Sequence, residues 1–467
     1  MMVFAGVGAA ALFALVGPAF HLQTYGDGSI FSYAVAARDV WDFHWRNIPT
    51  RATVYALTLW PGEMSVALTG DAQAGVLVYG LLLFAAPAVG LTATYALDRT
   101  SGRIFFVFAC ASTVLLCPLV FGFPTEMWIA HAMFWPTIAA AFSLRPGPVS
   151  ATALAILMCG LVLSHEGGLV LAFGVAGATS LSGLRDARFV RAALCFVVAV
   201  GLWIAVDRCF PPDGYFGEVR VRAASEFFDR TIFESPILSL IASALGSYAA
   251  LYVAFTRLRW GAPHYLATGV VCCALIVWWA SFDHALHADH RYYMRTVLLI
   301  GVCDLAAVAV FLVLDDEQAP VARLAPIRAV LVRLRGVLVA RFLMGTALVV
   351  LLAHAVESAK FVRAFEAYRG AVRALALGDQ FDAALGAPYF VSSRRISGDL
   401  NRLSWFSTTP YLSALVADFR PKRLVIDPAG NYFWLSCATA TRSAEEKSAV
   451  PRETREMIRV YSCLHRT

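Results

Sequence analysis

One carboxylate near the N-terminus, Asp27, has a position that suits an acid–base group. Asp27 follows an apolar stretch at 3–20 by a few residues and begins a segment with helical spacing. A carboxylate there sits at the positive end of a helix and partly out of water, in reach of a lipid headgroup and an incoming hydroxyl, so it suits a general base. An aspartate before a helical run is also what an N-cap looks like. The sequence leaves both interpretations open.

More polar residues follow in the same stretch and in the next one. The candidate substrate-binding residues here are Arg38, Asp42, His44 and Glu63. Arg38 and Asp42 are also spaced for an ion pair on a helix surface, which would involve no substrate.

A second cluster, at 283–295, has residue types that bind phosphate. His287, Arg291 and Arg295 are spaced to share one helical face, and His290 precedes Arg291. A buried arginine is costly unless it meets an anion, so a phosphate is the natural partner, while arginines that reach the headgroups are the alternative. His287 and Asp289 would also allow a Mg²⁺ or Mn²⁺ ion shared with that phosphate, or they are solvated loop residues.

A third group of polar residues recurs at the same predicted end of several apolar segments. It comprises Glu126, His131, His165 and Glu166. Polar side chains are costly at these depths unless they are paired or face a wet cavity. Their repetition at one end favours a cavity, whereas each histidine alone is explained by contacts within the bundle.

The elements that position these residues are predicted to be membrane helices. Of the 467 residues, 59% are hydrophobic and 15% are charged, and the apolar residues gather into eleven segments that suit a bilayer. The predicted spans are 3–20, 75–97, 104–121, 128–143, 149–164, 168–183, 190–206, 236–255, 265–281, 292–314 and 341–356. The spans at 149–164 and 168–183 could instead form a re-entrant hairpin. The first segment lacks a basic start and a cleavage site, so we expect a retained helix.

Arginines fix the predicted orientation of the bundle. They occupy every second connection, at positions such as Arg99, Arg145 and Arg257. Because positive residues stay on the cytoplasmic side, the candidate site residues fall on the outer face. The net charge of +6 is largely explained by these turns, so nothing indicates a nucleic-acid partner.

Two connections are too long to be turns. The outer loop 21–74 contains amphipathic stretches at 29–46 and 51–68, which suit helices lying in the membrane interface. Residues 357–467 begin as a helix and then alternate strand candidates, such as 423–427 and 457–461, with turns. We therefore predict a transmembrane domain at 1–356 and a small extracytoplasmic α/β domain at 357–467. Cys437 and Cys463 in that domain could form a disulfide.

This layout resembles the GT-C superfamily of integral membrane glycosyltransferases, which use polyprenyl-phosphate-linked sugars. The likeness covers nearly the whole chain: a first span, a long outer loop with two interfacial helices, further spans and an extracytoplasmic C-terminal domain. In that family an acid just after the first span is the catalytic base, and Asp27 matches this position. His290-Arg291-Tyr292 looks like the Arg-Tyr element that often binds the donor phosphate there. The chain has Gly26-Asp27-Gly28 where many members have two adjacent acids.

The resemblance implies an inverting transfer of a sugar to an acceptor hydroxyl on the periplasmic face of a bacterial inner membrane. Asp27 would be the base, and Arg291 and Arg295 would stabilise the departing lipid phosphate. The acceptor would be a glycan, a lipid or a protein. A transporter or flippase of a lipid-linked saccharide is the alternative, although no internal repeat supports it. A non-catalytic assembly protein that binds through 357–467 is a third interpretation.

Overall fold

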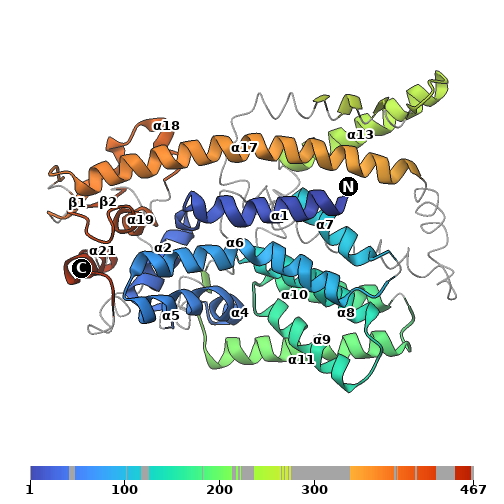
Figure 1. The fold of residues 1–467 in the computed structure, drawn as a ribbon, viewed down its shortest axis with the longest axis horizontal. Helices are drawn as coiled ribbons and strands as arrows, with labels where there is room; N and C mark the ends of the chain where they lie inside the picture. The colour runs from blue at the N-terminus through green and yellow to red at the C-terminus, as the bar shows by residue number, and fades with distance from the viewer. Residues whose placement is uncertain are drawn as a thin grey trace.

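The chain folds into a mostly helical bundle, with its C-terminal elements gathered at one end (Figure 1). The computed structural model describes residues 2–41, 48–100, 102–116, 126–180, 182–212, 236–263, 337–382, 388–404, 407–427 and 448–463, with a few more at 217–221, 266–274 and 385.

Three of the described helices are long and apolar enough to cross a membrane, as expected for a membrane protein. They are α1 (Met2–Ala19), α6 (Ala72–Leu97) and α11 (Ala187–Cys209). Further predicted spans are present as helices α7 (Ile104–Leu116), α8 (Met127–Ser143), α9 (Pro148–Val162), α10 (Gly167–Ser180) and α13 (Pro236–Arg257). The span at 292–314 and most of that at 265–281 lie outside the described residues. The total of eleven spans therefore stays a prediction.

Helices α9 and α10 are shorter than a bilayer core. Their 15 and 14 residues rise about 20 Å, against roughly 30 Å of hydrocarbon. They pack against each other and against α8. This length is compatible with the re-entrant hairpin as well as with two short spans.

Glycines let the helices of the bundle approach closely. A Cβ at Gly90 of α6 would lie 2.4 Å from the backbone oxygen of Ala132 in α8. A Cβ at Gly6 of α1 would lie 2.4 Å from Cys110 of α7. Small residues at helix contacts are the usual basis of close packing between membrane helices.

The loop 21–74, which was predicted to lie on the outer face, contains helices, as predicted, but the first of them differs from the expected interfacial helix. Helix α2 (Asp27–Ala37) ends at Arg38, whose φ of 58° is left-handed, instead of continuing to residue 46. The ion pair of Arg38 and Asp42 along one continuous helix is therefore ruled out. Ten of its 11 residues are buried, because α6 lies on one side and C-terminal elements on another. Helix α2 is a core element and not an amphipathic surface helix.

The second helical stretch of this loop does have an exposed apolar face. It runs without a break through α4 (Ala52–Val54), the π-helical turn η3 (Tyr55–Leu59) and α5 (Trp60–Thr69). Leu57, Trp60, Met64 and Leu68 are exposed along it at helical spacing. This face fits the predicted place in the membrane interface.

The C-terminal elements begin with one long helix. Helix α17 (Val337–Leu377) continues through residue 357 and lies beside α1 (Figure 1). After it come β1 (Phe390–Ser392), η10 (Ser393–Arg395), α18 (Gly398–Asn401), α19 (Thr409–Val416), β2 (Leu424–Ile426) and α21 (Arg452–Cys463). Strands β1 and β2 pair in parallel, with Phe390 opposite Leu424. The predicted strand at 423–427 is confirmed as β2.

The predicted strand at 457–461 is wrong, because these residues belong to α21. Thr454, Ile458 and Tyr461 are buried at a spacing of four and three residues, which is the period of a helix face. This face packs in the core that also contains α2 and α19. The described part of the C-terminal region therefore shares its core with the first outer loop. A separate α/β domain at 357–467 stays a prediction.

Candidate functional site

Asp27 is the first residue of α2 and not its N-cap. The cap position belongs to Gly26, whose φ of 55° is left-handed, and no side chain caps the helix end. Gly26 follows the short η1 turn (Leu22–Thr24) that leads out of α1. The N-cap interpretation of Asp27 is therefore wrong, and the half-buried carboxyl group is available for another role.

The surroundings of Asp27 make it an unusually strong base for a carboxylate. Burial, reinforced by the negative charge of Glu126 and opposed by Arg51, raises the pKa of Asp27 from 3.8 to about 7. A helix N-terminus alone would have favoured the charged form. Desolvation therefore dominates here, and near neutral pH Asp27 exchanges a proton readily.

Arg51 organises the other charged groups around this carboxyl. Its guanidinium nitrogens lie 2.7 Å from Glu126 Oε1 and 3.0 Å from Glu166 Oε2. The Arg51 side chain is only 12% exposed. One cation therefore joins the residue before α8 to the turn between α9 and α10, and the two carboxylates leave this ion triad with a net charge of −1.

The backbone around Arg51 is tied to the same turn. Arg51 ends the short turn η2 (Pro49–Arg51), and the amide of Thr53 donates to the carbonyl of Leu163 at 3.0 Å. The Thr53 hydroxyl donates to the carbonyl of Gly160 at 2.8 Å, and the Thr50 hydroxyl contacts Glu166 Oε1 at 3.4 Å. These bonds hold the first outer loop against the helix hairpin, so Arg51 has little freedom to leave its partners.

Glu166 and His165 complete the site. Burial would raise the pKa of Glu166, but Arg51 and His165 outweigh it and lower the pKa to about 2. Burial and Arg51 lower the pKa of His165. His165 Nδ1 accepts the Gly167 amide at 3.0 Å, so a neutral ring carries its proton on Nε2. At neutral pH, Glu166 is a fixed anion and His165 is neutral.

The structure thus joins three of the predicted site residues, Glu126, His165 and Glu166, through contacts with Arg51 or with each other. Asp27 is linked to them through the charges of Glu126 and Arg51, which act on its pKa. The remaining described ones lie apart. His131 Nε2 lies 2.8 Å from Ser112 Oγ and 3.4 Å from Trp135 Nε1, which are contacts within the bundle. Arg38 and Glu63 interact near the other end of α2.

The predicted phosphate and metal residues are not in the described part of the chain. Asp42, His44, His287, Asp289, His290, Arg291 and Arg295 lie outside it, as do Cys437 and the side chain of Cys463. Among the described residues, no three of His, Cys, Asp and Glu come together as metal ligands. The carboxylates of Glu126 and Glu166 have Arg51 between them instead.

Arg51 is the residue that sequence reasoning missed. One signal was available: most arginines of the predicted bundle fall in turns predicted to be cytoplasmic, whereas Arg51 falls in a loop predicted to lie on the outer face. A cation near the ends of apolar segments is costly unless an anion lies close to it, and Glu126 and Glu166 were the acids predicted at the same ends of these segments.

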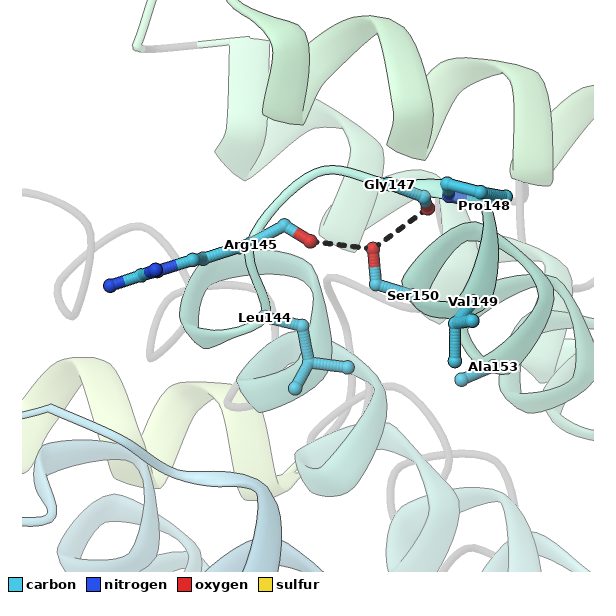
Figure 2. A pocket seen from close by; sticks show the side chains of 7 residues that line it. All are labelled: Leu144, Arg145, Gly147, Pro148, Val149, Ser150 and Ala153. Atoms are coloured by element: carbon cyan, nitrogen blue, oxygen red, sulfur yellow. Dashed lines mark hydrogen bonds between the residues drawn. The ribbon is translucent and has the colours of Figure 1, made fainter.

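A separate surface hollow lies at the far end of α8 from Glu126. It has a volume of about 420 Å³ and is lined by residues of the turn into α9, from Leu144 to Ala153. Figure 2 shows Ser150 donating to the carbonyls of Arg145 and Gly147, while the Arg145 side chain points away. Arg191 of α11 donates hydrogen bonds to the Ser150 hydroxyl oxygen at 2.8 Å and to the Leu144 carbonyl at 3.0 Å. The polar groups here close a turn and do not form a reactive site.

Comparisons with protein-family models, with curated proteins and with solved structures found no match to this chain.

Proposed function

We propose that this chain is a membrane glycosyltransferase that moves a sugar from a polyprenyl-phosphate donor to an acceptor hydroxyl on the periplasmic face of a bacterial inner membrane. One observation carries the proposal: Asp27, beside the first membrane helix, is a half-buried carboxyl group whose pKa lies near 7. A group of that pKa takes a proton from a substrate and releases it to water at neutral pH.

In the proposed reaction, Asp27 accepts the proton of the acceptor hydroxyl while the hydroxyl oxygen attacks the anomeric carbon. The bond from that carbon to the phosphate oxygen breaks, and the lipid phosphate leaves with the electron pair. Attack opposite the leaving group inverts the anomeric centre. Arg291 and Arg295 are the proposed partners of the departing phosphate.

The ion triad supports Asp27 in this role. Glu126 and Glu166 take up the charge of Arg51, so Arg51 does not pair with Asp27 as a carboxylate. Within the described part of the chain Asp27 makes no ion pair, and the negative charge of Glu126 reinforces the effect of burial, so Asp27 keeps its affinity for a proton. A simple surface ion pair would have had the opposite effect.

The test is transfer of radiolabelled sugar from crude bacterial polyprenyl-phosphate donors into endogenous acceptors. Membranes carrying wild type, Asp27→Asn and Asp71→Asn at matched expression are compared. Asp71 is a matched control because it caps α6 in the same outer loop and is exposed. We expect transfer to be lost in Asp27→Asn and retained in Asp71→Asn. Equal transfer in all three membranes would remove Asp27 as the base and favour the transporter or flippase.

A further inference from the structure

A second polar cluster lies at the opposite end of α2 from Asp27. It consists of Arg38, Trp41, Tyr55 and Glu63, which we call the Trp41 cluster. The 11 residues of α2 separate it from Asp27 by about 16 Å along the helix axis. Neither Arg38 nor Glu63 is among the groups that shift the pKa of Asp27. The cluster is therefore distinct from the ion triad.

Two aromatic rings form one side of the Trp41 cluster. The ring centroids of Trp41 and Tyr55 are 5.4 Å apart, with an edge-on angle of 66°. Trp41 is 52% exposed. Tyr55 belongs to the π-helical turn η3, and such turns inside helices are frequent at functional sites.

The acid of the cluster has an unused hydrogen-bonding atom. Glu63 accepts a hydrogen bond from the backbone amide of Val40, next to Trp41. Its Oε2 atom is shielded from solvent and has no hydrogen-bond partner among the residues that the structure describes. Leaving a buried acceptor unpaired costs free energy, so a ligand that donates a hydrogen bond to Glu63 would recover this loss. The charge of Arg38 acts on the same carboxylate.

Trp60, on the exposed apolar face of α5, gives a comparison for Trp41 within the same chain. Trp60 is 49% exposed, nearly as much as Trp41. Its exposed neighbours on that face, Leu57, Met64 and Leu68, are all apolar. Trp41 instead contacts Tyr55, which is linked by charge to Glu63, and Glu63 in turn to Arg38. Similar exposure with polar neighbours distinguishes the Trp41 cluster from a membrane anchor.

We propose that the Trp41 cluster is a binding subsite for a saccharide portion of the acceptor. The faces of Trp41 and Tyr55 would pack against the apolar side of a sugar ring, Glu63 would accept hydroxyl hydrogens, and Arg38 would donate to ring or hydroxyl oxygens. Because the subsite is about 16 Å from Asp27, it holds a part of the acceptor remote from the reacting hydroxyl. The assignment of the bound saccharide to the acceptor rests on the proposed function, whereas the binding of a saccharide at this cluster does not.

The test is saturation-transfer difference NMR on the purified full-length protein in detergent micelles. The probes are methyl glycosides of glucose, galactose and mannose, and maltotriose. Four proteins are compared: wild type, Trp41→Ala, Glu63→Gln and the control Trp60→Ala. We expect at least one probe to bind wild type, binding to weaken about tenfold in both cluster variants, and the control to stay within about twofold of wild type.

Three results would overturn the subsite: no probe binds wild type, the cluster variants bind as wild type does, or Trp41→Ala and Trp60→Ala weaken binding equally. Glu63→Gln keeps the shape of the side chain, so it remains informative should Trp41→Ala fold poorly. Label transfer separates the two proposals. Saccharide binding without transfer refutes the glycosyltransferase alone, and transfer without saccharide binding refutes the subsite alone.

Discussion

The strongest prediction from the site concerns stability and needs no substrate. Replacing Asp27 by Asn removes a carboxyl group whose charged form is disfavoured in the folded protein. The pKa of Asp27 is about 7 in the fold against an ordinary 3.8. The folded state therefore binds a proton that the unfolded chain has released between these two values. The stability contributed by the protonated carboxyl is fully present below pH 3.8 and is lost as the pH rises through 7.

The size of the effect follows from this shift. At pH 8 the ionised Asp27 lowers the free energy of unfolding by about 4 kcal/mol, and at pH 5 by about 1.5 kcal/mol. These are upper values, because Asp27 is only half-buried and solvent screens part of the interaction. Asn resembles the protonated carboxyl and carries no charge at either pH. The variant should therefore be more stable than wild type, by about 2.5 kcal/mol more at pH 8 than at pH 5.

The assay is thermal unfolding of purified wild type, Asp27→Asn and Asp71→Asn in detergent between pH 5 and pH 8. The unfolding entropy is about 1 kcal/mol/K for a chain this long. The unfolding temperature of Asp27→Asn relative to wild type should therefore rise by about 2–3 °C from pH 5 to pH 8. Asp71→Asn should show no such trend, since Asn caps a helix as well as Asp does. If the unfolding temperature of Asp27→Asn is no higher than that of wild type, or if the difference shrinks toward pH 8, then Asp27 is not a desolvated carboxyl group with a raised pKa.

Three further outcomes follow from the same contacts. Label transfer by wild type should rise about tenfold between pH 6 and pH 8, and a flat profile would contradict a base of pKa 7. Glu126→Gln removes a negative charge that raises the pKa of Asp27, so this variant should show the rise at lower pH. Arg51→Gln should lower the free energy of unfolding by about 3 kcal/mol in chemical denaturation, because the buried Glu126 and the half-buried Glu166 lose their cation. Gly17→Ala should lower the unfolding temperature, since its Cβ would lie 2.4 Å from a phenylalanine ring of α6, whereas Gly8→Ala on the same helix meets nothing within 4 Å and should not.

Sequence reasoning predicted the three long apolar helices α1, α6 and α11 because their signal is local. The segments at 75–97 and 190–206 are recognised by hydropathy alone, and they are present as α6 and α11. Their backbone bonds are made within each segment, so composition decides the outcome. The site was predicted in part for a similar reason. Glu126 and Glu166 stand out as acids at the ends of apolar runs, whatever they pair with.

Reasoning from local pattern failed where packing against distant residues decides. The stretch at 29–46 looks amphipathic, yet α2 is buried nearly all round because α19 and α6 cover it. The hydroxyl of Ser29 shows this contact, since it donates to the carbonyl of Thr408 at 2.9 Å, 379 residues away. In the same way, residues 457–461 alternate like a strand but form part of α21, whose buried face has the helical period.

The sequence by itself determined where the apolar helices fall, three of them long enough to cross a membrane, and that Asp27 stands just after the first of them. Only the tertiary structure decided the acid–base properties of Asp27. Its proton affinity depends on burial and on Glu126, which is 99 residues away in the chain, and Arg51 is neutralised by two acids from two other segments. Desolvation and charge–charge interactions act through space, so no local pattern around Asp27 contains them.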